Sequence, residues 1–273
     1  MHRKARLLRI LACSVMGWCL TLTIPCYGQN EEPAILANVA DPGRISSEEP
    51  IVKNFSAEKA ARYLDTAALH WAGTHKCVSC HTDMGYLFAR PALNPTLPDS
   101  GEVRAFYERY VTETWKDEPP SQGVHAVVVA SGLTFNDAQT TGKLHEVTRR
   151  ALDLMWKVQR EDGSWQWLKC GWPPMESDEH YGVTLAALTV GMAPEKYAET
   201  EAARAGLKKV RSYLENNQPL SLHHRAMVAW ASQRIHGLMS DQQRAETLEE
   251  LLSLQRPDAG WSTPGLLADW KEF

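Results

Sequence analysis

Hydrophobic residues recur at helical spacing once the first 55 residues of the chain are passed. The segment that opens with Ser56 has small or apolar side chains along one face, at Ala60, Tyr63, Leu64, Ala67 and Ala68. Steps of three and four residues are typical of an amphipathic helix, and a serine at its start is a favourable N-cap. Two further helices are predicted, one over 86–93 that ends near Pro91 and one over 103–115.

The second half of the chain continues with one helical pattern after another. We expect helices at about 124–137, 144–159, 179–192, 199–215, 221–237 and 242–255. The alternating pattern of a half-buried strand is almost absent, and the one β-prone run, Val127-Val128-Val129, continues into helical spacing. The sequence therefore predicts an all-α fold.

The first 28 residues have the pattern of a secretory signal peptide. The first nine residues carry four basic side chains and no acidic one, an apolar run extends to Pro25, and Cys26-Tyr27-Gly28 offers small residues before a cleavage point. The apolar run is short for a membrane-spanning helix and a polar segment follows at once, which favours cleavage over anchoring. We therefore expect an exported protein, periplasmic or secreted.

The rest of the chain divides into three parts. Residues 29–55 are rich in Pro, Glu, Ser and Asn and are interpreted as a linker, residues 56–120 as a small helical segment, and residues 121–273 as a larger helical array. Without residues 1–28 the chain has 25 basic and 33 acidic residues, a net charge of about −8. This acidic balance argues against nucleic acid as a partner.

The most specific motif is the pentapeptide Cys77-Val78-Ser79-Cys80-His81. C-x-x-C-H is the attachment signature of a c-type haem, in which both thiols bond to the porphyrin edge and the adjacent imidazole ligates the iron. We therefore predict one covalent haem c on Cys77 and Cys80, with His81 as an axial ligand of the iron. The motif resembles that of the c-type cytochromes, and this resemblance implies haem attachment outside the bacterial cytoplasm, which agrees with export.

Other uses of the cysteine pair fit less well. A zinc site needs two more nearby ligands, and Cys170 is the one further cysteine after the signal peptide. A thioredoxin-like redox pair needs a βαβ context, which the flanking sequence does not have. Three cysteines suit one haem and a spare thiol better than a disulfide framework.

The sequence leaves the second axial position of the iron open. Met84 is three residues from His81 and is expected on the same side of the haem. The candidates are His75, His125, Met175 and His180, or the iron has no second protein ligand. His223 and His224 lie in a predicted helix, where packing or surface roles are favoured. Arg90 either pairs with a haem propionate or caps its own helix.

Two similar turns occur in the second half of the chain. Residues 159–165 are Q-R-E-D-G-S-W and residues 255–261 are Q-R-P-D-A-G-W. Each has a glutamine at a predicted helix end, a turn in which glycine adopts the left-handed conformation, and a tryptophan that folds back over the helix. The recurrence resembles the QW repeats of squalene-hopene cyclases and their prenyltransferase-like relatives. The resemblance implies an α/α-toroid of inner and outer helices over roughly residues 124–273.

A closed toroid needs more helix pairs than these, because each unit buries its face only against its neighbours. Either the sequence is a truncated product, or it is a half-toroid that closes against another subunit. Four tryptophans near the turns are candidates to line a cavity for an apolar small molecule: Trp156, Trp165, Trp167 and Trp172. Their positions favour packing around the turns instead.

The cyclases use a D-x-D-D motif, ahead of an apolar helix, to protonate their substrate. The nearest equivalent here is Glu176-Ser177-Asp178-Glu179. The resemblance implies Asp178 as the general acid, with the two glutamates raising its pKa. Only one of the three acidic positions matches the motif, and acidic residues are also common at the start of any helix.

These observations lead to three functional hypotheses. The leading one is an exported monohaem c-type cytochrome-like protein joined to a squalene-cyclase-like toroid, which transfers electrons to a redox partner protein or binds ligands through its haem. The alternative is a terpene-cyclase-type or haem-dependent enzyme that acts on an apolar substrate in the toroid cavity, with Asp178 as general acid. The third is a structural toroid in which the haem motif is vestigial.

Overall fold

The computed structural model describes residues 48, 53–75, 77–115, 122–169, 178–219 and 221–266. Within these ranges the regular structure is helical and there is no strand, which confirms the all-α prediction. The signal peptide and most of the predicted linker lie outside the described residues, and so do Cys170, Trp172, Met175 and Glu176. The expectations for these residues stay predictions.

The described chain contains ten α-helices and three short helical turns. The α-helices are α1 (Ala57–His75), α2 (Asp83–Ala89), α3 (Glu102–Arg109), α4 (Gly123–Thr140), α5 (Glu146–Lys157), α6 (Glu179–Met192), α7 (Glu201–Asn216), α8 (Leu222–Ser232), α9 (Asp241–Ser253) and α10 (Thr263–Leu266). The turns are the 3₁₀ helices η1 (Arg90–Leu93) and η3 (Tyr197–Glu199) and the π-helical turn η2 (Tyr110–Thr114). None of the described helices is both long enough and apolar enough to cross a membrane.

The predicted helices agree with these elements, with differences at their ends. Ser56 is the N-cap of α1 as expected, because its Oγ accepts a hydrogen bond from the Lys59 N–H at 3.2 Å. The chain from Tyr86 to Leu93 leaves the α-helix at Ala89, and the 3₁₀ turn that follows contains Pro91. Helix α8 ends at Ser232, five residues before the predicted end, and the segment that follows places Arg234 and Ile235 close against Gly191 of α6.

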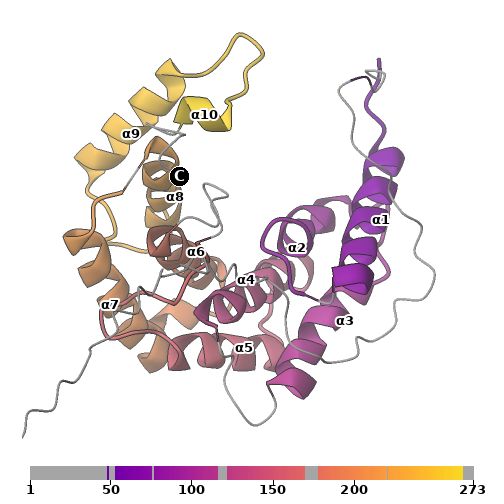
Figure 1. Ribbon diagram of the computed structural model, residues 1–273, viewed down its shortest axis with the longest axis horizontal. Helices are drawn as coiled ribbons and strands as arrows, with labels where there is room; N and C mark the ends of the chain where they lie inside the picture. The colour runs from indigo at the N-terminus through magenta and orange to yellow at the C-terminus, as the bar shows by residue number, and fades with distance from the viewer. Residues whose placement is uncertain are drawn as a thin grey trace, which may run out of the picture.

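The helices form a curved array with two rows (Figure 1). Along the concave side α2, α4, α6, α8 and α10 each contact the next, and along the convex side α1 contacts α3, η2 contacts α5, and α5 contacts α7. The two ends of the array, α1 and α9 with α10, face each other across an open side (Figure 1). An even-numbered helix is therefore an inner helix and an odd-numbered helix an outer one.

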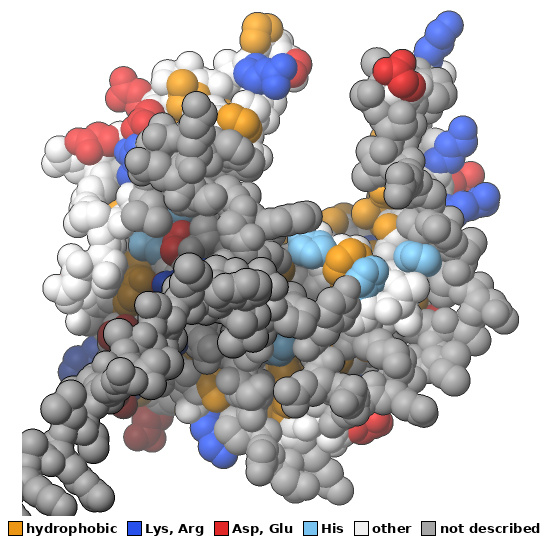
Figure 2. Space-filling model, in the orientation of Figure 1, with side chains coloured by type: hydrophobic (Ala, Val, Ile, Leu, Met, Phe, Trp, Pro, Cys, Tyr) orange, Lys and Arg blue, Asp and Glu red, His pale blue; other side chains and the backbone are white. Residues whose placement is uncertain are grey.

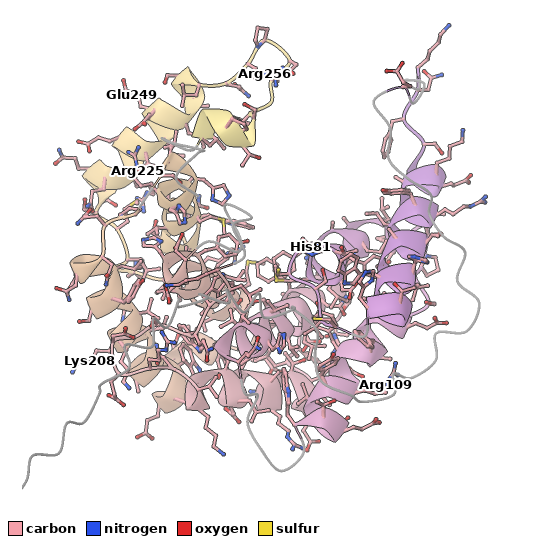
Figure 3. The ribbon with its side chains drawn as sticks, viewed as in Figure 1. His81, Arg109, Lys208, Arg225, Glu249 and Arg256 are labelled. Carbon is pink, nitrogen blue, oxygen red and sulfur yellow. The ribbon has the colours of Figure 1, made fainter. Side chains whose placement is uncertain are left out.

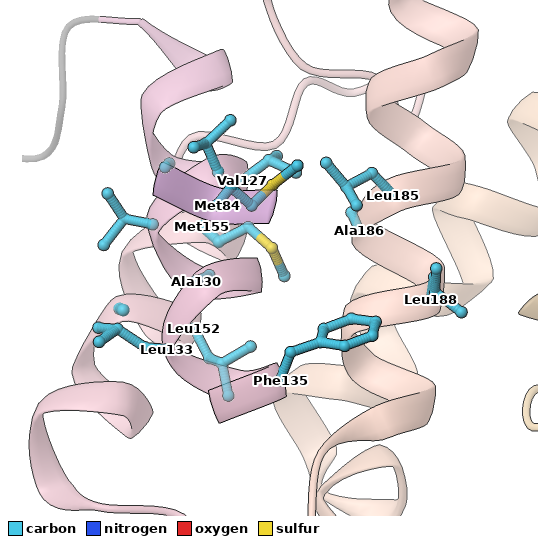
Figure 4. Packing of buried hydrophobic residues seen from close by; sticks show 14 of the residues in the cluster. Met84, Val127, Ala130, Leu133, Phe135, Leu152, Met155, Leu185, Ala186 and Leu188 are labelled. Atoms are coloured by element: carbon cyan, nitrogen blue, oxygen red, sulfur yellow. The ribbon is translucent and has the colours of Figure 1, made fainter. Parts of the chain in front are cut away.

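The core lies around the inner helices α4 and α6. Every described side chain of α6 from His180 to Val190 is buried, and the same holds for α4 from Gly123 to Asp137 except at His125. Helices that are apolar on all sides are typical of the centre of a helical protein. Side chains of α2, α4, α5 and α6 meet there (Figure 4). The Oγ atoms of Ser131 and Thr189 are 2.6 Å apart and join the two central helices.

Candidate haem-attachment site

The C-x-x-C-H segment is the loop between α1 and α2, at the N-terminal end of the first inner helix. The Ser79 Oγ accepts hydrogen bonds from the N–H groups of His81 and Thr82, at 3.3 and 2.8 Å. The Ser79 carbonyl accepts from the Met84 N–H at 3.0 Å and from the Tyr107 hydroxyl of α3 at 3.1 Å. The serine at the second variable position therefore fixes the loop to both α2 and α3.

The two cysteines differ in exposure. Cys77 is half-buried, whereas Cys80 is 7% exposed and belongs to the main core. The two thiols and Asp83 lie close enough to Tyr107 to add to the effect of burial, which raises the pKa of this tyrosine well above its ordinary value. Attachment at Cys80 therefore requires this side chain to turn out of the core, or to react before the core closes.

The His81 side chain is exposed and lies on the concave side of the array (Figure 3). Its Nδ1 is 2.9 Å from the Thr82 Oγ1 and 3.3 Å from the Ser79 Oγ. The Trp71 ring of α1 meets it edge-on, with ring centroids 4.8 Å apart, and stacks on His75 at 3.8 Å. A hydrogen bond at one ring nitrogen orients an imidazole so that its other nitrogen, here Nε2, can bind a metal.

The residues of the loop fit a covalently attached haem. Two thiols and an imidazole lie within five residues, the imidazole is oriented through Nδ1, and the loop is fixed to a buried apolar support that includes Val78 and Met84. Histidine and hydrophobic side chains gather beside the hollow between the two ends of the array, the α1 arm and the α9 arm (Figure 2). In the part of the chain that the structure describes, no group of three or more His, Cys, Asp or Glu could hold a metal ion. A haem needs no such group, because the porphyrin supplies four of the iron ligands.

The structure places the candidates for the second axial position in different surroundings. Met84 is 4% exposed and packs in the core. His75 stacks on the same tryptophan that contacts His81. His125 lies at the start of α4, where burial lowers its pKa. His180 belongs to a separate cluster, described below.

Arg90 has a structural role between α1 and η1. It is 2% exposed, and its Nε and Nη2 donate to the Asp65 carboxylate at 2.8 and 3.2 Å. Its Nη1 donates to the Asn94 Oδ1 and to the Leu97 carbonyl, at 2.9 and 2.7 Å. The guanidinium is therefore occupied by protein acceptors, and pairing with a haem propionate has no support in this arrangement.

A second group of polar residues lies at the N-terminal ends of the inner helices α6 and α8. Asp178 is the N-cap of α6 and accepts a hydrogen bond from the Tyr181 N–H at 3.2 Å. Its Oδ2 is 3.0 Å from the His224 Nε2, and the His224 Nδ1 is 2.7 Å from the Ser221 Oγ. Ser221 is itself the N-cap of α8. Sequence reasoning missed this Asp178–His224–Ser221 chain, although all three residues stand at predicted helix starts.

Asp178 and its neighbour Glu179 have different partners. The Asp178 Oδ1 accepts a hydrogen bond from the Tyr181 N–H, and its Oδ2 lies within hydrogen-bond distance of the His224 Nε2. Glu179 pairs instead with Lys169 at 3.4 Å and Arg160 at 3.8 Å. Glu176 lies outside the described residues. Asp178 is therefore a helix cap that also contacts His224, and its role as general acid stays a prediction.

Two histidines around His224 are held neutral. Burial, with a contribution from His224, lowers the pKa of His180 and of His223 to about 4. The His180 and His224 rings meet edge-on at 5.3 Å, and His223 stacks on Tyr181 at 6.2 Å. The expectation that His223 and His224 serve packing is consistent with these contacts.

The two QW turns have the same internal hydrogen bonds. The Trp165 Nε1 donates to the Met155 carbonyl at 2.8 Å, and the Trp261 Nε1 donates to the Leu251 carbonyl at 2.7 Å. In each turn the glutamine Nε2 donates to the carbonyl four residues later, at Gly163 and at Ala259, at 3.1 and 2.8 Å. The residue at that position has positive φ, 92° and 63° respectively. In the second turn the left-handed residue is therefore Ala259, whereas the expected residue, Gly260, is not among those with positive φ.

The described tryptophans pack, as the sequence analysis favoured. Trp165 is fully buried, and Trp156 and Trp167 lie against Gly206 and Gly182, where a Cβ atom would come within 2.3 Å of each indole. A cavity of about 230 Å³ does occur near α2 and α3, but the residues around it are mostly polar and include none of these tryptophans. An apolar ligand site therefore stays a prediction.

Comparisons with known proteins found no relative of this chain. No protein-family model, no curated protein and no solved structure matches the chain.

Proposed function

We propose that this chain is an exported c-type haem protein that binds one haem covalently through Cys77 and Cys80 and ligates its iron with His81. The observation that carries the proposal is the geometry of the C-x-x-C-H loop, where His81 is oriented through Nδ1 and lies on the concave side of the array. The haem would supply one-electron redox chemistry, which suits electron transfer to a redox partner protein or haem-based ligand binding.

Each residue around the loop has a role in this proposal. The two thiols fix one edge of the porphyrin, and the Ser79–Tyr107 hydrogen bond keeps the loop on α3. Trp71 contacts the edge of the His81 ring and limits its rotation. The expected signal peptide, whose residues lie outside the described part of the chain, takes the protein to the periplasm or the exterior.

We also propose that the helical array is a partial α/α-toroid. Two observations support this: the rows of inner and outer helices, and the identical hydrogen bonds of the two QW turns. The array provides a rigid concave surface beside the loop. The cyclase-type alternative rests on Asp178 as general acid, and the described contacts of this carboxyl group are with the Tyr181 N–H and with His224.

The test is expression of the full chain with a cytochrome c maturation system, followed by a pyridine haemochrome spectrum of the denatured protein. We expect a c-type spectrum with one haem per chain. The C77S/C80S double variant should retain no haem after denaturation. His145→Ala serves as a control, because His145 is exposed and lies at the start of α5, outside the loop.

The spectrum of the folded protein separates attachment from ligation. His81→Ala should change the absorption of the folded haem protein, since the iron then loses its axial imidazole. A folded, exported wild-type chain without covalent haem would contradict the proposed function and favour the hypothesis of a vestigial motif.

A further inference from the structure

Helices α5 and α9, each with the QW turn that follows, are two copies of one structural unit. The equivalent residues are 96 positions apart, as in Gln159 and Gln255 or Trp165 and Trp261. Both copies make the same hydrogen bonds within the turn. Because the two units have the same internal structure, they can be compared for the helices that pack on them.

In the first unit the outer helix α7 covers the end of α5 and the turn. Besides its bond within the turn, the Gln159 Nε2 donates to the Gly206 carbonyl of α7 at 3.2 Å. Trp156 lies directly against Gly206, and Gly163 lies so close to the Lys209 carbonyl that a Cβ atom would be 2.3 Å from its oxygen. In this unit Trp165 and Leu152 are fully buried, with α4 on the inner side of α5 and α7 on its outer side.

The second unit has no such cover among the described residues. Leu248, Leu252 and Trp261 are 43%, 61% and 38% exposed, although their equivalents in the first unit, Leu152, Trp156 and Trp165, are buried or partly buried. The bond that Gln159 makes to α7 has no counterpart at Gln255 within the described chain. We call the surface formed by Leu248, Leu252, Leu254 and Trp261 the α9 face.

We infer that the α9 face binds an outer helix from a second copy of this chain, and that this helix is α1. α1 is the first outer helix of the described array, and its exposed side includes Lys59, Arg62 and Tyr63, whereas Ala61, Ala68 and Ala72 are buried within the chain. α1 is also exposed at its N-terminal end, where Tyr63 is 49% and Phe55 is 81% exposed. Association of α1 with α9 is head-to-tail, so each copy uses two different surfaces.

Charge supports this choice of partner. Near the exposed aromatic residues, Lys53, Lys59 and Arg62 form no ion pair with any described residue. On α9, Glu246 and Glu249 likewise form no ion pair in the described chain. In Figure 2 basic side chains outnumber acidic ones along the outer side of the α1 arm, acidic side chains are prominent along the α9 arm, and each arm also has side chains of the other sign; Figure 3 labels Glu249 on the α9 arm. Opposite charges at the two ends favour α1 on α9 over α9 on α9.

This inference rests on the proposed partial toroid and adds an interaction surface to it. It does not depend on haem attachment. The experiment is sedimentation velocity of the full exported chain over a wide concentration range. We expect concentration-dependent association in the wild type, and at least about 100-fold weaker association in Leu252→Glu and in Tyr63→Glu, since each change places a charge in a buried apolar contact. Ala205→Glu on the exposed side of α7 is the matched control and should associate like the wild type.

Mixing the two variants gives the decisive measurement. Leu252→Glu keeps an intact α1 and Tyr63→Glu keeps an intact α9 face, so an equimolar mixture should form a one-to-one dimer and nothing larger. A wild type that stays monomeric overturns the inference. So does a Tyr63→Glu variant that associates like the wild type while Leu252→Glu does not, because this result indicates α9-to-α9 contact. Circular dichroism shows that each variant is folded, and unchanged haem content keeps this test separate from that of the proposed function.

Discussion

The two QW turns place different residues in one backbone conformation. Gly163 and Ala259 both have positive φ, which costs an L-amino acid about 1 kcal/mol more than it costs glycine. Ala259→Gly should therefore raise the free energy of unfolding by about 0.5 kcal/mol, after the greater entropy loss of glycine is subtracted. Gly163→Ala should lower it by more than about 2 kcal/mol, because its Cβ would meet the Lys209 carbonyl. Urea unfolding of both variants checks the opposite signs, and equal signs would contradict the equivalence of the turns.

Neutral His180 and His223 make stability depend on pH. Their pKa values are lowered to about 4 in the folded chain, from an ordinary value of 6.5. As the pH falls below 6.5 the unfolded chain binds protons that the folded chain does not, so stability is lost as the pH falls toward 4. The limiting slope is about 1.4 kcal/mol per pH unit for each histidine.

The measurement is the free energy of unfolding between pH 7 and pH 5, a window above the ordinary carboxyl range. The H180Q/H223Q double variant should show a much smaller slope than the wild type in this window. His145→Ala, which alters an exposed histidine outside this cluster, is measured beside them as the control. Parallel curves for the double variant and the wild type would contradict the assignment.

Asp83 changes stability with pH in the opposite direction to His180 and His223. Its carboxyl group is fully buried, neither oxygen has a hydrogen-bond partner of good geometry, and burial raises its pKa well above 3.8. A raised pKa means that this side chain destabilises the fold as the pH rises through the folded value. Asp83→Asn should therefore be more stable than the wild type at pH 7, with a difference that shrinks toward pH 3.8. A thermal-unfolding series over this range checks the trend, and a loss of stability at pH 7 would contradict it.

Arg90 joins the first helix to the rest of the array. The buried guanidinium bonds Asp65 of α1 and two acceptors in and after η1. Arg90→Met should lower the free energy of unfolding by about 2 kcal/mol, less than for a fully buried pair because the Asp65 side chain is 32% exposed. Haem content and the spectrum of the folded protein should not change. A changed haem spectrum at unchanged stability would instead support the propionate role.

The sequence predicts the helices well because the apolar period of each one is set by the face it buries. It predicts α6 to the residue, since Asp178 is a favourable N-cap. It fails at the end of α8, where the tight contact of Ile235 with Gly191 depends on α6, far away in the sequence. Local pattern carries no information about such a contact.

Some groupings of functional residues are predicted from the sequence and others are missed. Cys77, Cys80 and His81 are adjacent in sequence, so their grouping follows from the motif alone. The pairing of Asp178 with His224 joins the starts of two helices, and only the packing of α6 on α8 brings them together. For Arg90 the sequence suggests a haem propionate or the end of its own helix as partner, whereas the structure pairs it with Asp65 of α1, a partner that depends on how α1 packs.

The whole array should unfold from its ends. In a one-dimensional array each unit is stabilised by its neighbours, so a central helix has two supporting interfaces and a terminal helix has one. α4 and α6 are buried on nearly all sides, whereas most side chains of α9 are exposed. Native-state hydrogen exchange should therefore show amides of α4 and α6 that exchange only by global unfolding, and amides of α9 that exchange at a clearly lower free energy.

If a second copy binds α9, the difference in hydrogen-exchange protection between the centre and the α9 end should depend on protein concentration. If α1 of a partner covers α9, protection of α9 should rise with protein concentration while protection of α4 and α6 stays the same. Leu252→Glu should remove the rise and leave the low-concentration gradient intact, because the substituted side chain is 61% exposed in the single chain. Uniform protection of all helices at low concentration would contradict the array description, since it would mean that the end units are as stable as the centre.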